Sequence, residues 1–350
     1  MYFNIAFIIF GLMLLVKGGD FLIDGSVSIA KRAKLSPLII GLTVVGFGTS
    51  MPELFVSAQA AMSGSPAISI GNVAGSNIAN IAFIIGLTAL IHPIPTKRDM
   101  MRIDMPFMLL CMIILMLAAL QETIERWMGI CMFAALIIYI TWEIQHTRKM
   151  QRLSKQHAAA AEALHNATKG PKPKQFIETL PDTTDEEEDK PIMPLWKAIL
   201  FVLLALAAMV LGANLLVEGA TSMAMALGKS FGVEQTQMER IIGLTVVAVG
   251  TSLPELFASA IAALKGQTDM AVGNIIGSCI FNILCVIGVS SIITPITNAW
   301  EPFYIDYIIQ FSAGLLLWFF LSTKNLLQRW EGATLLTLYA LYIGYTIINN

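Results

Sequence analysis

Two glutamates, Glu53 and Glu255, stand in the middle of otherwise apolar stretches of this 350-residue chain. A charged carboxylate at the centre of a bilayer costs at least ~2.5 kcal/mol, so each should face a cavity, a partner or a bound cation. Each also ends an S-x-x-E pattern that contains a proline, at 50–53 and 252–255, which is typical of a capping box at the start of a helix. A helix that starts halfway along an apolar stretch implies a broken span, which lipid tolerates only around an enclosed cavity.

Oxygen-bearing side chains and glycines accompany both glutamates. The segments 46–49 and 248–251 precede the two patterns, and glycine there permits a turn that exposes backbone carbonyls to a hard cation. The candidate side-chain donors are Thr49, Thr251, Ser50, Ser252, Ser76, Ser278, Asn80 and Asn282. For Asn72, Asn274, Ser57 and Ser259, a ligand role and a packing role are equally open. An all-oxygen set suits Ca²⁺, which takes about 6–8 oxygens at ~2.3–2.6 Å, and Na⁺ by the same hardness argument, but not zinc or copper.

These candidate donors occur twice because the chain contains an internal repeat. Residues 41–80 and 243–282 are identical at 23 of 40 positions, without gaps and at a constant offset of 202. One difference is Cys279, which replaces Asn77 of the first copy and which we expect to face away from the site. The repeat predicts that two equivalent segments build one site.

The composition excludes a soluble globule. Hydrophobic residues make up 56% and charged residues 13%, with a mean hydropathy of +0.71, whereas soluble domains carry about 25% charge. The net charge of −2 gives no basic field for nucleic acid. Ten stretches reach the length that a bilayer requires: 3–28, 37–61, 68–91, 103–120, 127–144, 196–226, 241–264, 270–293, 303–322 and 332–348.

A polar segment divides these stretches into five and five. We therefore predict an all-α polytopic membrane protein, with a first five-helix repeat at 1–144, a polar linker at 145–195 and a second repeat at 196–350. Because five is odd, the second repeat enters the membrane in the opposite sense, which gives two inverted-topology repeats with broken helices at the ion site. Nine Lys and Arg residues lie in the short loops on the side of the linker, and three lie in the short loops on the other side. Because Lys and Arg are enriched in cytoplasmic loops, we predict that the linker is cytoplasmic and that both termini are outside.

The paired Gly-Thr-Ser-x-Pro-Glu and Gly-Asn-x-x-Gly-Ser-x-x-x-Asn motifs resemble the two α-repeats of the cation/Ca²⁺ antiporter superfamily, most closely its bacterial sodium/calcium exchanger branch. The resemblance implies a plasma-membrane antiporter, not an enzyme, that exchanges Na⁺ for Ca²⁺ by alternating access and needs no cofactor. It implies that the eight donors above ring the ion sites with Glu53 and Glu255, while Gly46 and Ala248 contribute carbonyls. Some relatives carry Asp where this chain has Asn282, so only two carboxylates remain and K⁺ dependence and stoichiometry stay open.

Other functions compete with this interpretation. A Ca²⁺/H⁺ antiporter would load the same glutamates with protons in place of Na⁺. A K⁺-dependent exchanger and a Ca²⁺-selective channel are further alternatives, and saturable counterflow would exclude the channel. An intramembrane enzyme is disfavoured because the symmetric glutamates have no accompanying nucleophile, histidine or aspartate pair.

Two groups of charges lie outside the repeated motifs. Lys17, Asp20 and Asp24 in the first stretch favour a local helix ion pair with interfacial carboxylates, and an ion vestibule that includes Glu218 is the alternative. The acidic run at 185–189 is typical of a solvated segment, with Ca²⁺ sensing as the functional alternative.

Overall fold

The chain folds into a bundle of long and broken helices. The computed structural model describes every residue except 1, 97, 169–192, 231–247, 298 and 350. In the first half the elements are α1 (Tyr2–Ala33), α2 (Pro37–Ile40), the π-helical turn η1 (Gly41–Val45), α3 (Gly46–Thr49), α4 (Met51–Met62), α5 (Ala67–Ile78), the π-helical turn η2 (Ala79–Ile84), α6 (Ile85–Ile91), β1 (Ile94–Pro95), α7 (Arg98–Arg102), α8 (Asp104–Ala119), β2 (Thr123–Ile124) and α9 (Arg126–Thr168).

The second half follows a similar order, although its described elements include no helix equivalent to α7. It contains α11 (Leu195–Ser230), α13 (Ala248–Thr251), α14 (Leu253–Leu264), α15 (Thr268–Phe281), the π-helical turn η4 (Asn282–Ile287), α16 (Gly288–Ile293), β3 (Ile296–Thr297), α17 (Tyr304–Lys324), β4 (Leu326–Leu327) and α18 (Arg329–Asn349). The acidic run at 185–189 and the start of the predicted span 241–264 lie outside the described residues.

Among the described residues, seven helices are long and apolar enough to cross a membrane, or eight if a bent pair counts as one span. The prediction of a helical, multi-pass membrane protein is therefore confirmed in outline. The last predicted span forms α18, which is not among the seven. Helix α9 continues to Thr168, so helix extends well into the segment predicted as a polar linker.

The first predicted helix break is present. Residues 37–49 and 51–62 form two helical segments bent by 44°. Pro37 opens α2 behind Ser36, whose side chain accepts a hydrogen bond from the Ile39 amide, and Pro52 lies in the first turn of α4. Proline suits both positions because an amide at a helix start has no partner within the helix.

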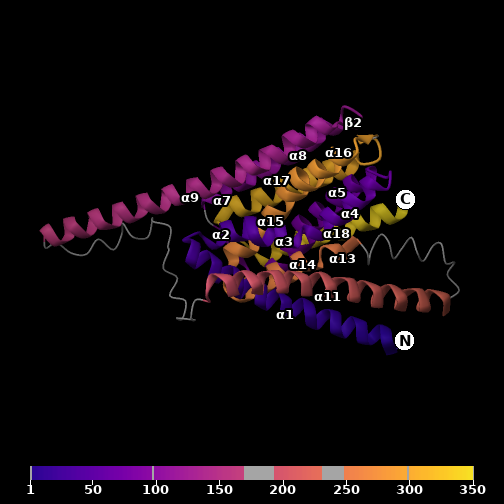
Figure 1. The fold of residues 1–350 in the computed structure, drawn as a ribbon, viewed down its shortest axis with the longest axis horizontal. Helices are drawn as coiled ribbons and strands as arrows, with labels where there is room; N and C mark the ends of the chain where they lie inside the picture. Colours follow the sequence, from indigo (N-terminus) through magenta and orange to yellow (C-terminus); the bar gives the residue numbers. More distant parts are fainter. Residues whose placement is uncertain (1, 97, 169–192, 231–247, 298, 350) are drawn as a thin grey trace.

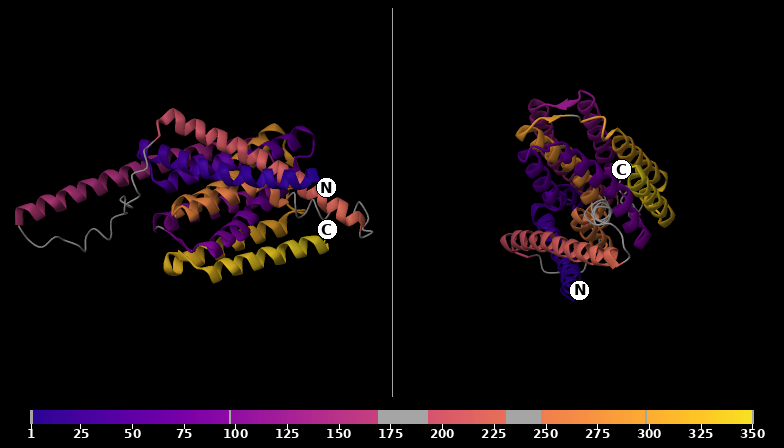
Figure 2. Two further views of the ribbon diagram at one scale, coloured as in Figure 1. Left: turned by 90° about the horizontal axis from the view of Figure 1, so that it is seen from below. Right: turned by 90° about the vertical axis from the view of Figure 1, so that its right-hand side faces the viewer.

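Helices α1 and α11 run antiparallel and pack along their length at the side of the bundle (Figures 1 and 2). Glycines spaced by seven residues, Gly11, Gly18 and Gly25, line this interface, and a Cβ added at each would lie 2.6–3.1 Å from a carbonyl oxygen of α11. Small residues permit such close backbone approach in membrane helices.

The remaining helices build the core and interlock the two halves. Helix α15 and the turn η4 are buried along nearly their whole length. Each pair of short strands joins one strand from each half, with Ile94 opposite Leu327 and Thr123 opposite Thr297. The segments that carry the repeated motifs therefore meet at the centre of the bundle (Figure 1).

Candidate ion-binding site

Glu53 and Glu255 are fully buried in the first turns of α4 and α14. Ser76 of α5 donates a hydrogen bond to Oε1 of Glu53 at 3.3 Å, and Ser50 donates to Oε1 of Glu255 at 3.4 Å. The other carboxylate oxygen, Oε2, has no hydrogen-bond partner among the described residues in either glutamate. Two buried carboxylates that each retain a free oxygen are suited to bind a cation.

The serines before the glutamates do not form the predicted capping boxes. Ser50 and Ser252 occupy the N-cap positions of α4 and α14, but neither side chain bonds to its own helix. Instead, Ser50 donates across to Glu255, and the hydroxyl of Ser252 lies 3.4 Å from that of Ser76. The capping-box interpretation is wrong because the neighbouring half offers these hydroxyls buried partners.

Further oxygens of the two halves meet around Thr49. Its hydroxyl donates to Oδ1 of Asn274 at 3.1 Å and lies 3.4 Å from the hydroxyl of Ser278. Ser278 in turn donates to the carbonyl oxygen of Gly46 at 3.4 Å. The structure thus brings a predicted carbonyl and three predicted polar side chains together, with a contribution from each half.

The four residues left open between packing and binding form two equivalent pairs. Asn72 donates to the hydroxyl of Ser57 at 3.0 Å and to the carbonyl of Glu53 at 3.2 Å. Asn274 donates to Ser259 at 2.9 Å and to the carbonyl of Glu255 at 3.4 Å. These bonds fix each glutamate-bearing helix against the helix that follows it.

The asparagines that end the motifs differ between the halves. Asn282 donates to the hydroxyl of Ser76 at 3.2 Å and to Oδ1 of Asn77 at 3.1 Å, which leaves its own Oδ1 without a partner among the described residues. Asn80 makes no hydrogen bond to an amide or hydroxyl in that same part of the chain, and its neighbour is the buried thiol of Cys279, which we expected to face away from the site. Asn77 and Gln310 were not predicted, and the sequence signal for Asn77 was its replacement by Cys279 in the second copy.

Two predicted residues are less completely described. Thr251 ends α13 and does form a polar interaction, whereas Ala248 is described only as the first residue of that helix. Among the described residues, no three His, Cys, Asp or Glu side chains lie close enough to hold a metal ion. Any cation held at the buried glutamates would therefore also depend on neutral oxygens.

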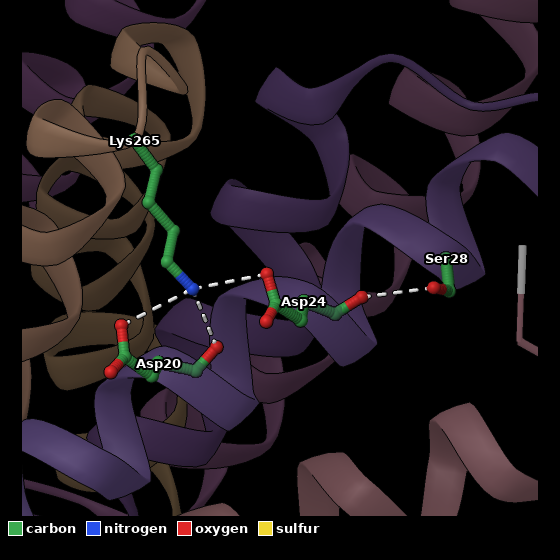
Figure 3. Close-up of polar contacts among 4 residues, drawn as sticks. All are labelled: Asp20, Asp24, Ser28 and Lys265. Carbon is green, nitrogen blue, oxygen red and sulfur yellow. Dashed lines mark hydrogen bonds and ion pairs between the residues drawn. The ribbon is translucent and has the colours of Figure 1, made fainter. Parts of the chain in front are cut away.

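The carboxylates of α1 have a partner distant in sequence. Lys265, in the turn between α14 and α15, lies 3.2 Å from Oδ1 of Asp20 and 3.0 Å from Oδ1 of Asp24 (Figure 3). It also donates to the carbonyl of Asp20, while Ser28 donates to the carbonyl of Asp24. An ion pair thus links α1 to the core, where sequence spacing favoured a local pair with Lys17.

Comparisons with known proteins agree with this arrangement. Residues 3–145 and 197–348 match the profile of a family described as sodium/calcium exchanger protein. The chain is 35% identical to CaxA of Alkalimonas amylolytica over 97% of its length and 96% of the relative's. It is 31% identical to the sodium/calcium exchanger MaX1 of Methanosarcina acetivorans, over 97% of each chain.

Solved structures give the same result. The structure superposes on that of the sodium-calcium exchanger NCX_Mj with a TM-score of 0.76, at 28% identity and over 98% of each chain. Other similar structures are of NCX_Mj soaked with Na⁺ together with Ca²⁺ or Sr²⁺.

Proposed function

Because the chain belongs to the sodium/calcium exchanger family and is thus a multi-pass membrane ion exchanger, we propose that it exchanges Na⁺ for Ca²⁺ at the site of Glu53 and Glu255. The observation that carries this proposal is the pair of buried carboxylates, each with Oε2 unpartnered among the described residues. Each glutamate lies next to hydroxyls, as a site for a hard cation requires.

The number of carboxylates in the site limits how many Ca²⁺ or Na⁺ ions it can neutralise. Two carboxylates neutralise one Ca²⁺ or two Na⁺, and neutral oxygens such as those of Thr49, Ser278 and Asn282 can hold a further Na⁺. Since both ions use the same oxygens, their binding is mutually exclusive. Downhill Na⁺ entry then drives Ca²⁺ out, provided that the loaded site alternates its opening and the empty site does not.

Contacts that recur when the two halves are exchanged support an inverted repeat. The pairing of β1 with β4 becomes that of β3 with β2. The close contact of Gly86 with Gly332 becomes that of Gly288 with Gly129. Two five-helix halves related in this way enter the membrane in opposite senses, as in other secondary transporters.

The orientation of the chain in the membrane can be inferred from the two ends of the helix bundle. Both termini lie at one end of the bundle, and the extension of α9 projects from the other end (Figures 1 and 2). The distribution of Lys and Arg assigns the end with α9 to the cytoplasm. We therefore place the termini outside and the 145–195 segment inside.

Alternating access requires one part of the protein to move against another. Helices α1 and α11 form a pair at the side of the bundle, while the glutamates lie on α4 and α14 in the core. We assign the movement to this helix pair. It can slide past the core without breaking the hydrogen bonds that join the two halves around Glu53 and Glu255.

Ca²⁺ uptake into proteoliposomes tests the proposal. An outward Na⁺ gradient should drive ⁴⁵Ca²⁺ into vesicles, and Glu53→Gln and Glu255→Gln should each abolish uptake, whereas Glu301→Gln, in an exposed turn, should not. Uptake driven by a pH gradient and not by Na⁺ would instead identify a Ca²⁺/H⁺ antiporter. Uptake that survives both glutamate substitutions would refute the assignment of the site, and replacement of K⁺ by choline tests K⁺ dependence.

A further inference from the structure

A row of buried amides connects α17 to the candidate ion site. Nδ2 of Asn77 donates to Oε1 of Gln310 at 3.5 Å, and Oδ1 of Asn77 accepts from Nδ2 of Asn282 at 3.1 Å. The three side chains are fully buried. Asn282 also donates to Ser76, whose hydroxyl donates to Glu53, so the row ends at a carboxylate proposed to bind the cation.

The order of donors and acceptors determines which end of Asn282 is free. Ser76 gives its hydrogen to Glu53 and so accepts from the NH₂ group of Asn282, while Asn77 presents its oxygen to Asn282 and its own NH₂ group to Gln310. Nε2 of Gln310 has no partner among the described residues. Asn282 therefore uses its NH₂ group for both of its hydrogen bonds, and its Oδ1 is left without a partner among the described residues. A rotation of this amide by a half-turn would exchange an oxygen for two N–H donors.

We propose that Asn77 and Gln310 are positioning residues that hold the oxygen of Asn282 toward the transported cation. The inference rests on the proposed function, because it assigns Asn282 to the site of Glu53 and Glu255. A cation is attracted by an amide oxygen and repelled by an amide NH₂, so the orientation of Asn282 sets the affinity for Ca²⁺ and Na⁺. Through the bond to Ser76, the same row leaves the Ser76 hydrogen available to Glu53.

The second half of the site lacks this row. Cys279 stands at the position equivalent to Asn77, and a thiol is a poor hydrogen-bond partner for an amide. Asn80, the counterpart of Asn282, has the thiol of Cys279 as its neighbour in place of an amide, and it makes no hydrogen bond to an amide or hydroxyl of the described residues. The chain therefore contains its own matched substitution, in which an asparagine of the motif has a thiol neighbour that holds its amide less firmly than Asn77 holds Asn282.

The test transfers that substitution to the first half. Asn77→Cys and Gln310→Met remove the row and should each raise the half-saturating Ca²⁺ concentration for Na⁺-driven uptake by about tenfold, the equivalent of ~1.4 kcal/mol, with the maximal rate nearly unchanged. Asn77→Asp keeps an acceptor for Asn282, and Gln310 can rotate to donate to it, so this variant should not weaken Ca²⁺ binding. An equal loss in Asn77→Asp and Asn77→Cys would overturn the proposal.

A double-mutant cycle shows whether the two residues act through Asn282. In an Asn282→Ala background, Asn77→Cys should produce no further rise in the half-saturating Ca²⁺ concentration. Additive effects, or a lower maximal rate at unchanged half-saturation, would indicate a merely structural role and would refute the inference.

A binding measurement separates failure of this inference from failure of the proposed function. The Ca²⁺-dependent shift of the melting temperature of each purified variant reports binding without transport. If the wild-type protein binds Ca²⁺ but does not exchange it for Na⁺, the proposed function fails and the variants still test the row. If the wild-type protein binds no Ca²⁺, the row is refuted together with the site.

Discussion

The packing of Gly277 against η1 gives a sharp prediction about how the site is held together. A Cβ added at Gly277 would lie 2.8 Å from Cα and 2.9 Å from the carbonyl carbon of Leu42, and it would also contact that carbonyl's oxygen. Ordinary contact begins at 3.4 Å, and the atoms involved belong to the backbone and cannot rotate away. Gly277→Ala must therefore separate α15 from η1 by roughly 0.5 Å, and overpacking of this kind costs about 1–3 kcal/mol.

The same displacement reaches the candidate ion site. Ser278 follows Gly277 directly, and its hydroxyl lies 3.4 Å from that of Thr49, close to the limit of a hydrogen bond. Gly277→Ala should therefore lower the melting temperature of the purified protein by several degrees, at ~2–4 °C per kcal/mol, and should also weaken Ca²⁺ binding. Both quantities can be measured on one preparation, by thermal unfolding with and without Ca²⁺.

Gly344→Ala is the matched control. It lies in α18, and apart from the nearby backbone of that helix no heavy atom of the described residues lies within 4 Å of a Cβ added there. Alanine at this position should leave Ca²⁺ binding unchanged and stabilise the helix by up to about 1 kcal/mol, since glycine is the weaker helix former. Equal melting temperatures for Gly277→Ala and Gly344→Ala would refute the argument from backbone contact.

Three other side chains provide smaller tests. Lys265→Ala removes partly exposed ion pairs between α1 and the core that are worth up to ~1 kcal/mol, so exchange should be up to about fivefold faster than in Lys265→Arg at low ionic strength. Equal exchange rates in the two variants would contradict this. Asn282→Asp adds a third carboxylate and should lower the half-saturating Ca²⁺ concentration for uptake by about tenfold. An unchanged half-saturating concentration would refute this prediction. Tyr139→Phe removes a 2.8 Å bond to the buried Asp104 and should cost ~1–3 kcal/mol of stability, whereas Tyr342→Phe, with a less buried partner, should lower the melting temperature less.

Hydropathy and repetition predicted much of the architecture, because the first depends only on average composition along a span and the second on a direct comparison of the two halves. The family assignment is confirmed, and the break before Glu53 is present as a bend of 44°. Hydropathy did not reveal that α9 continues to Thr168. The added turns of α9 are polar, so they have no apolar period that a hydropathy profile would detect, and they are stabilised in part by continuation from the apolar helix before them.

The site shows the limit of local rules more clearly. S-x-x-E forms a capping box when the serine hydroxyl has no hydrogen-bond partner other than water and the backbone of its own helix. Ser50 and Ser252 are buried against the other half of the chain, where a carboxylate and a hydroxyl compete for them. The sequence identified these residues because the motif repeats, but it could not identify their partners, which lie about 200 positions away.

Residues that differ between the repeats give the two halves different polar contacts. Lys265 replaces Ser63 of the first copy, so the salt link to Asp20 and Asp24 forms in the second half and has no charged counterpart at Ser63. Cys279 replaces Asn77, so Asn282 donates to an amide oxygen while its counterpart Asn80 lies beside a thiol. An exchanger with a fully symmetric site and symmetric contacts would favour neither of its two open states. We therefore expect the 17 positions at which the 40-residue copies differ to contain the residues that set which open state the proposed exchanger prefers when it is empty.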